Sequence, residues 1–203
     1  NHVLLEEVQT LVEAYGKRFM VCEAPDDPVA YAATTSCGRA FAFQSTGAVF
    51  ASARNASTDP GVVSVLNAPA FDRMPLILSN HDRFAGDRVW DQVGGDIEQY
   101  RLAAATYLLS SRNPFTYYGE EIGMRDIPLK RNEVLDPPGK KYWPIYKGRD
   151  GCRSPMQWDD TAYAGFSSQQ PWLPVHRNYR TRNVQLQGAD QISMLSFTRS
   201  LIR

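Results

Sequence analysis

Hydrophobic positions recur with a helical period in several parts of the chain. Between residues 3 and 15, Leu4, Val8 and Leu11 fall on one helical face, and Gly16 follows the pattern as a stop signal. The other predicted helices are a broken one over 48–66, interrupted at Asp59-Pro-Gly, one opened by Asp96 with Gln99 three residues later, and a last one capped by Asp190.

Short apolar runs between these helices predict buried strands. They cover residues 18–25, 40–44, 75–80 and 114–119. Helices that alternate with such strands imply a parallel sheet with crossover helices, either doubly wound or part of a barrel. No Gly-x-Gly-x-x-Gly stretch follows the first strand, which disfavours a dinucleotide-binding fold.

The segment 124–188 has no clear period and is rich in Pro, Gly, Trp and charged residues. A loop of this length is usually functional or disordered. Most of the tryptophans lie inside it, including Trp143, Trp158 and Trp172. We therefore expect an ordered, functional insertion.

Charge and composition exclude several classes of protein. The 22 Lys and Arg residues balance 22 Asp and Glu residues, so no basic field attracts a nucleic acid. The apolar runs are too short to cross a bilayer. Three cysteines without C-x-x-C spacing predict reduced thiols with Cys22 in the core, and a Cys37–Cys152 bridge stays open. The histidines show no metal-ligand spacing.

Carboxylates follow three of the predicted strands. They are Glu23, Asp82 beside His81, and the pair Glu120 and Glu121. Because active sites of such folds lie at the carboxyl ends of the strands, these acids are candidates for catalysis. Paired carboxylates serve in glycoside hydrolysis, where one acid protonates the leaving oxygen and another stabilises the positive sugar centre.

Longer motifs carry a resemblance to a known family. Leu78–Asp82 (LSNHD), Tyr117–Met124 (YYGEEIGM) and Gly148–Asp159 (GRDGCRSPMQWD) resemble glycoside hydrolase family 13, the α-amylase family. The PMQWD and Pro171–Pro174 (PWLP) stretches are most similar to the α-glucosidase and oligo-1,6-glucosidase branch. In contrast, residues 81–92 resemble bacterial α-amylase-like members, which leaves the subfamily open.

The resemblance implies an α/β fold, a partial (β/α)8 TIM barrel with about strands five to eight, their helices and a long insertion after strand eight. Residues 1–203 would form the C-terminal half of the catalytic barrel, with 124–188 as the insertion and no complete second domain. A family calcium site would belong to the missing half, so no cofactor is expected in this chain.

The family motifs also imply roles for individual residues. Glu23 matches the general acid/base of a retaining mechanism, a role that burial and a neighbouring carboxylate would favour. Asp82 matches the acid that grips hydroxyls of the reacting glucose and supports the transition state. His81 matches a histidine that hydrogen-bonds the same sugar, and Asn80 would hold the turn.

Two arginines complete the implied site. Arg149 matches a residue that contacts the non-reducing glucose, and Arg153 is the second arginine of the same motif; a structural salt bridge is the alternative for both. Glu120 and Glu121 match a stretch that shapes the rim, which makes a structural role the first expectation.

The family nucleophile is an aspartate in a Gly-Phe-Arg-x-Asp-like motif, and these 203 residues contain no such motif. The chain alone is therefore expected to be inactive, because the covalent glycosyl-enzyme intermediate cannot form. The alternative is a non-catalytic truncated or relic family member that serves as a binding or oligomerising module. The implied partners are an α-glucan, oligosaccharide or α-glucoside, with no nucleic acid and no membrane, and a homo-oligomer through exposed barrel edges. The sequence does not indicate a localisation.

Overall fold

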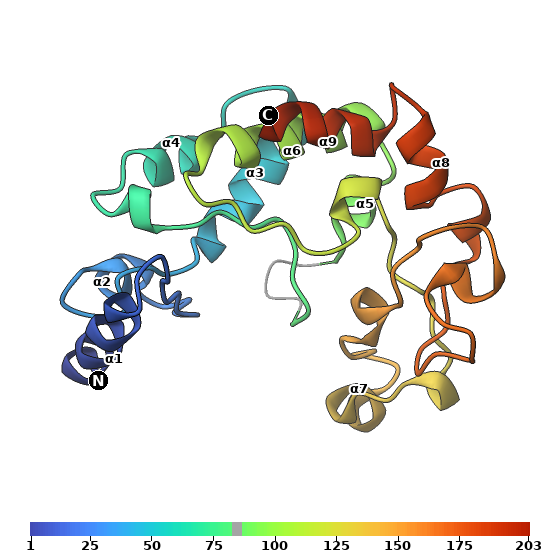
Figure 1. Cartoon of the computed structure of the whole chain (residues 1–203), viewed down its shortest axis with the longest axis horizontal. Helices are drawn as coiled ribbons and strands as arrows, with labels where there is room; N and C mark the ends of the chain where they lie inside the picture. The colour runs from blue at the N-terminus through green and yellow to red at the C-terminus, as the bar shows by residue number, and fades with distance from the viewer. Residues whose placement is uncertain (83–86) are drawn as a thin grey trace. The chain divides into compact units, whose positions relative to one another are not determined.

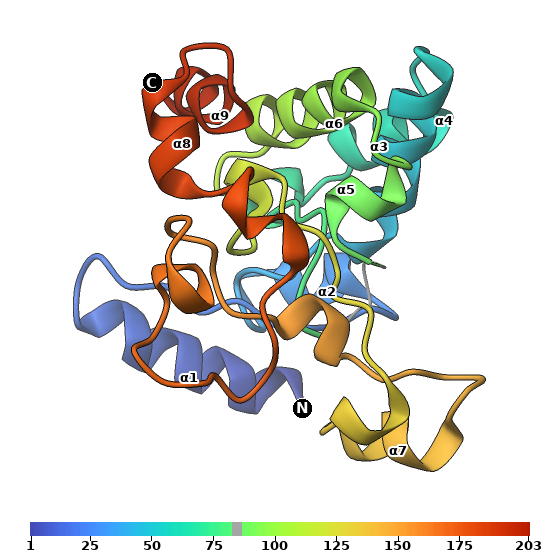
Figure 2. The same ribbon diagram turned by 90° about the vertical axis from the view of Figure 1, so that its right-hand side faces the viewer.

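The computed structural model describes residues 1–82 and 87–203 (Figures 1 and 2). It divides into two compact units, Asn1–Ile77 with Leu102–Phe115, and Leu78–Arg101 with Thr116–Arg203. The α-helices are α1 (His2–Ala14), α2 (Pro28–Ala32), α3 (Phe43–Asn55), α4 (Pro60–Leu66), α5 (Val89–Gln92), α6 (Ile97–Ser110), α7 (Pro137–Tyr142), α8 (Val184–Ala189) and α9 (Met194–Ile202). The 3-10 helices are η1 (Phe71–Arg73), η2 (Glu120–Ile122), η3 (Arg131–Glu133), η4 (Asp150–Arg153), η5 (Ala162–Gly165) and η6 (Arg177–Arg180).

In the first unit, each extended segment is hydrogen-bonded to the next extended segment along the sequence. Cys22 forms a parallel bridge with Ala40, and Ile77 forms one with Phe115. Between them, the N–H groups of Ala40 and Ala42 donate to the carbonyl oxygens of Arg73 and Pro75. Four extended segments therefore lie side by side in parallel register, as expected from the alternation of helices and apolar runs.

The predicted strands are shorter than expected. Among the described residues, the extended segments form isolated bridges rather than continuous ladders. Pro75 has no N–H to donate, which removes one possible ladder hydrogen bond. Residues 43 and 44, predicted as the end of a strand, instead begin helix α3.

The break predicted in the 48–66 helix is present. Helix α3 ends at Asn55, and α4 begins at Pro60, where the Asp59 side chain accepts a hydrogen bond from Gly61 N. Ser52 Oγ in turn accepts a bond from Asp59 N at 2.8 Å. A proline in the first turn and an aspartate cap are favourable at a helix start, so the local sequence accounts for the second helix.

Helix α1 forms where the periodicity predicts it, but most of its large apolar side chains face solvent. Leu4 is 64 % exposed and Leu11 is 60 % exposed, while Tyr15, just after the helix, is 69 % exposed. The buried residue of this helix is Gln9, whose side chain donates to Glu13. The amphipathic pattern therefore predicts the helix correctly but does not show which surface its apolar face packs against.

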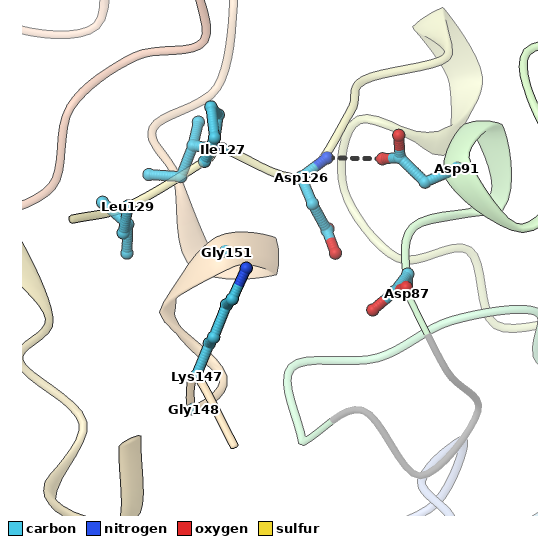
Figure 3. Close-up of a pocket in the computed structure, with 9 residues that line it drawn as sticks. Asp87, Asp91, Asp126, Ile127, Leu129, Lys147, Gly148 and Gly151 are labelled. Carbon is cyan, nitrogen blue, oxygen red and sulfur yellow. Dashed lines mark hydrogen bonds between the residues drawn. The ribbon is translucent and has the colours of Figure 1, made fainter. Parts of the chain in front are cut away.

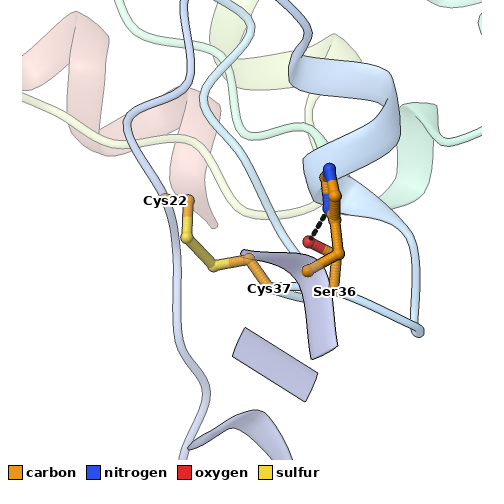
Figure 4. The surroundings of a disulfide bond; sticks show 4 residues. Cys22, Ser36 and Cys37 are labelled. Atoms are coloured by element: carbon orange, nitrogen blue, oxygen red, sulfur yellow. Dashed lines mark hydrogen bonds between the residues drawn. A yellow bond between two sulfur atoms is a disulfide. The ribbon is translucent and has the colours of Figure 1, made fainter. Parts of the chain in front are cut away.

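The expectation for the cysteines was wrong. Cys22 and Cys37 form a disulfide that links the first extended segment to the loop after α2 (Figure 4). Beside it, His2 Nδ1 and Ser36 Oγ are hydrogen-bonded at 2.7 Å. The two cysteines are 15 residues apart, and only the fold brings them together. Cys152 is buried as a thiol.

Helix α6 begins where the capping pattern predicts. Asp96 Oδ1 accepts hydrogen bonds from Glu98 N and Gln99 N. Further along, Tyr100 is buried and donates its hydroxyl to Glu120 O at 2.7 Å. This bond ties the start of α6 to η2, the turn that carries Glu120.

The last part of the second unit has its own small core. It consists of Ile122, Met124, Met156 and Leu195, with Val184 packed against it. Helix α9 is capped by Ser193, whose Oγ accepts from Ser196 N, rather than by Asp190 as predicted. No described helix has the length and apolarity needed to span a membrane.

Candidate active site

The candidate site is built on the turn that follows residues 75–79. Asn80 is buried, and its Oδ1 accepts a hydrogen bond from Asp82 N at 3.0 Å. An asparagine that bonds the backbone two residues later stabilises a tight turn. The turn holds the Asp82 carboxyl group in place, and residues 83–86 of the same motif lie outside the described part of the chain.

Two arginines converge on one oxygen of Asp82. Arg149 Nη1 lies 2.9 Å from Asp82 Oδ1, and Arg153 Nη2 lies 2.8 Å from the same atom. His81 Nε2 lies 3.4 Å from the other oxygen, Oδ2. The Asp82 side chain remains 22 % exposed, so this carboxylate is oriented by its neighbours yet still accessible.

Arg149 is itself held by Asp136, a residue that the sequence motifs did not single out. Arg149 Nη2 donates to Asp136 Oδ1 at 2.7 Å and Nε donates to Oδ2 at 3.2 Å, a bidentate pair. These hydrogen bonds lower the pKa of Asp136 and raise that of Arg149. Asp136 is 13 residues from Arg149, so no local pattern indicates the pair.

The second arginine is anchored through backbone atoms. Arg153 Nε donates to His81 O at 2.8 Å, in addition to the contact of Nη2 with Asp82. Asp150 Oδ2 accepts from the N–H groups of Leu135 and Asp136, which fixes η4 against the segment before α7. The two arginines are thus held by a network of fixed polar groups.

Arg88 is a further residue that sequence reasoning missed. It is fully buried, and its Nη1 and Nη2 each donate at 2.7 Å, to Tyr118 O and Cys152 O. Its guanidinium also lies 5.1 Å from the ring centre of Tyr117 and 4.7 Å from that of Tyr118. Because Cys152 directly precedes Arg153, Arg88 supports the backbone that carries this arginine.

Glu120 and Glu121 lie in the turn after residues 114–118. Glu120 is buried, accepts a hydrogen bond from Ser79 Oγ at 2.5 Å and another from Tyr117 N, and burial raises its pKa to about 8. Burial also raises the pKa of Glu121, whose Oε2 accepts from Gly119 N. The Glu120–Ser79 bond supports the residue just before Asn80, which agrees with the structural role expected first.

Glu23 lies in the first unit, directly after the bridged Cys22, and is exposed. The burial expected for a general acid is therefore absent within this unit. The structure brings Asn80, His81, Asp82, Arg149 and Arg153 together in the second unit, whereas Glu23 belongs to the first unit.

An acidic pocket of about 320 Å³ lies in the second unit (Figure 3). Asp87, Asp91 and Asp126 line it together with Lys147. Asp91 accepts from Asp126 N at 2.7 Å and pairs with Arg125 at 2.7 Å. Within residues 1–82 and 87–203, no cluster of three or more His, Cys, Asp or Glu side chains is arranged to hold a metal ion.

A sequence model of the α-amylase catalytic domain matches residues 2–203. The chain belongs to the α-amylase family. A probable α-glucosidase of Rhizobium meliloti is 36 % identical over 126 residues, which cover 62 % of this chain and 23 % of that protein. The salivary α-glucosidase of Aedes aegypti is 38 % identical over 141 residues, covering 66 % and 23 %. A probable oligo-1,6-glucosidase of Bacillus subtilis is 34 % identical, covering 63 % and 26 %.

Solved structures agree with this family. The α-glucosyl transfer enzyme XgtA superposes with a TM-score of 0.75 at 28 % identity, covering 96 % of this chain and 37 % of that one. The trehalose-6-phosphate hydrolase of Bacillus licheniformis gives 0.73 at 21 % identity, covering 98 % and 42 %, a likeness of fold alone. The chain thus has the fold of part of an α-amylase-family TIM barrel and spans about a quarter of the length of these curated relatives.

Proposed function

We propose that this chain forms the sugar-gripping part of a retaining glycoside hydrolase that acts on α-glucosidic bonds, and that it corresponds to strands five to eight of the barrel. The observation that carries the proposal is the Asp82 carboxylate, held by Arg149 and Arg153 at 2.9 and 2.8 Å and still accessible. The relatives named above as α-glucosidases and an oligo-1,6-glucosidase support the choice of substrate.

The geometry suits recognition of a terminal glucose. A carboxylate accepts several hydrogen bonds, so Asp82 can bind sugar hydroxyls while both arginines hold it in orientation. His81, whose side chain is 56 % exposed, offers a further donor or acceptor beside it. Hydrogen bonds to sugar hydroxyls that strengthen as the ring becomes positively charged lower the barrier for glycosidic cleavage.

Catalysis needs two more groups. Glu23 would protonate the leaving oxygen as general acid and then activate water as general base. The nucleophilic carboxylate would come from outside these 203 residues, so the chain by itself is expected to bind sugar without turning it over. A non-catalytic binding module would show the same binding, and the two functions separate when the complete barrel is assayed.

Calorimetric titration of the chain with methyl α-glucoside tests the sugar-gripping site. Asp82→Asn should weaken binding about tenfold or more, because hydrogen bonds to a charged group are worth roughly 1.5–3 kcal/mol. Asp72→Asn is the matched control, since Asp72 is exposed and pairs with Arg112 at 3.1 Å. Equal affinity of wild type and Asp82→Asn would contradict the proposal.

The proposal that the nucleophile lies outside these 203 residues is tested by release of p-nitrophenol from p-nitrophenyl α-glucoside. The chain alone should give no turnover while circular dichroism shows an intact fold. Turnover that Glu23→Gln abolishes would mean that another carboxylate of this chain acts as nucleophile, and the proposed division of the catalytic groups would then be wrong.

A further inference from the structure

A second cavity, separate from the acidic pocket, lies in the second unit and is surrounded by aromatic side chains. We call it the aromatic pocket. Its volume is about 450 Å³, and its lining includes Tyr118, Glu121, Arg153, Trp158, Phe166 and Trp172. This volume falls within the range of roughly 300–1,000 Å³ that is typical of small-molecule sites, which combine apolar walls with a few polar groups.

The aromatic walls are unusually open to solvent. Trp158 is 48 % exposed, Phe166 is 46 % exposed and Trp172 is 58 % exposed. Large aromatic side chains bury much area when they find a partner, so three of them left open around one hollow mark a binding surface. All three lie within residues 158–172 of the 124–188 segment, drawn in orange in Figure 2.

The walls of the pocket are held by the backbone. Trp158 N donates to Ala164 O at 2.9 Å, and Trp158 O accepts from Gln185 N at 2.9 Å. Tyr118, another lining residue, donates its hydroxyl to Ser154 O at 2.6 Å. A pocket whose walls are fixed in advance loses little conformational entropy when it binds a ligand.

The polar groups at the pocket connect it to the candidate site. Arg153 lines the pocket and also contacts Asp82 Oδ1 at 2.8 Å. Glu121 supplies a carboxylate on the same lining. One guanidinium therefore separates the aromatic pocket from the carboxylate proposed to grip the terminal glucose.

We propose that the aromatic pocket binds a further glucose ring of an α-linked oligosaccharide whose terminal ring is held by Asp82. This inference rests on the proposed function. A pyranose ring has apolar C–H faces that stack on the exposed indoles, and hydroxyl groups at its edge that bond to Arg153 and Glu121. The pocket would thus make the protein prefer oligosaccharides over single sugars.

The test compares one ligand that fills one ring site with ligands that can fill both. Methyl α-glucoside, maltotriose and isomaltotriose are titrated separately into wild type, Trp172→Ala and Trp172→Phe. At least one trisaccharide should bind more tightly than the monosaccharide. Trp172→Ala should weaken that binding about tenfold, as expected for loss of a stacked aromatic, and should leave methyl α-glucoside unchanged. Trp172→Phe should restore most of the affinity.

The control variant is Tyr142→Ala, which removes an aromatic side chain that is 53 % exposed and outside the pocket lining. It should leave every affinity unchanged. Equal trisaccharide affinity in wild type and Trp172→Ala overturns the inference. It is also overturned if neither trisaccharide binds wild type more tightly than methyl α-glucoside does. If Asp82→Asn leaves all affinities unchanged while Trp172→Ala still weakens the trisaccharide, the pocket is supported and the role of Asp82 is overturned.

Discussion

The charged side chains of the candidate site form ion pairs, in which arginines balance the charges of the carboxylates. Asp82 is balanced by Arg149 and Arg153, and Asp136 by Arg149. Glu120 differs, because it is buried and its nearest side-chain partner is the neutral hydroxyl of Ser79. Removing a carboxylate from water disfavours its charged form, which explains why its pKa rises to about 8.

This raised pKa predicts that stability falls as the pH increases. Between the ordinary value of 4.5 and about 8, folded Glu120 keeps its proton while the unfolded chain loses it. Its contribution is complete below the lower value and is lost as the pH rises to the upper one, with a slope of up to about 1.4 kcal/mol per pH unit. The free energy of unfolding in urea should therefore fall across this range, and less so in Glu120→Gln.

Glu98→Gln is the control for this measurement, because the Glu98 side chain is 75 % exposed. It should show the same pH dependence as wild type. A residual slope in Glu120→Gln is expected from Glu121, whose pKa is raised by burial too. Identical slopes in wild type and Glu120→Gln would show that folding does not raise the pKa of Glu120.

At the scale of secondary-structure elements, neighbouring residues determine where a helix starts. The tertiary fold determines which elements lie next to each other. Asp96 caps α6 at the position that the sequence predicts, and Asp59 caps α4 at the predicted interruption of the helix. The Cys22–Cys37 bond has no such local signal, although it holds the extended segment that carries Glu23 to the loop after α2. The position of Glu23 therefore depends on a covalent link between two elements.

Reduction of this disulfide should destabilise the first unit. Closing a loop of 15 residues restricts the unfolded chain, which corresponds to about 3 kcal/mol in the chain-entropy treatment. We expect a reducing agent to lower the urea midpoint of wild type. The double variant Cys22→Ser, Cys37→Ser should start at the lower midpoint and should not respond to the reductant. A wild-type midpoint that ignores reductant would contradict a structural role for the bond.

At the scale of the whole molecule, the chain spans about a quarter of the length of its curated relatives, and its first helix exposes an apolar face. The large apolar side chains that α1 exposes are those of Val3, Leu4, Val8 and Leu11. Monomeric proteins rarely leave large apolar patches in contact with water, so such a face favours association. We therefore expect copies of this chain to associate through the apolar face of α1.

Sedimentation velocity tests this expectation. The wild-type chain should sediment as a species larger than 22.8 kDa. Leu4→Glu combined with Leu11→Glu should shift it toward the monomer, because burying the new carboxylates in an interface is costly. Glu7→Lys, a charge change at another exposed position of α1, should leave association unchanged. A monodisperse wild-type monomer would contradict an interaction through α1.

The sequence by itself determined the family, the start of α6 and the break before α4, and it named Asn80, His81, Asp82, Arg149 and Arg153 as candidate site residues. These depend on local patterns, because a cap, a helical period or a motif is complete within a few neighbouring residues. Only the tertiary structure decided the Arg149–Asp136 pair, the buried Arg88 and the Cys22–Cys37 bond. Each of these joins positions that are distant along the chain, and their interaction exists only after folding has brought them within reach.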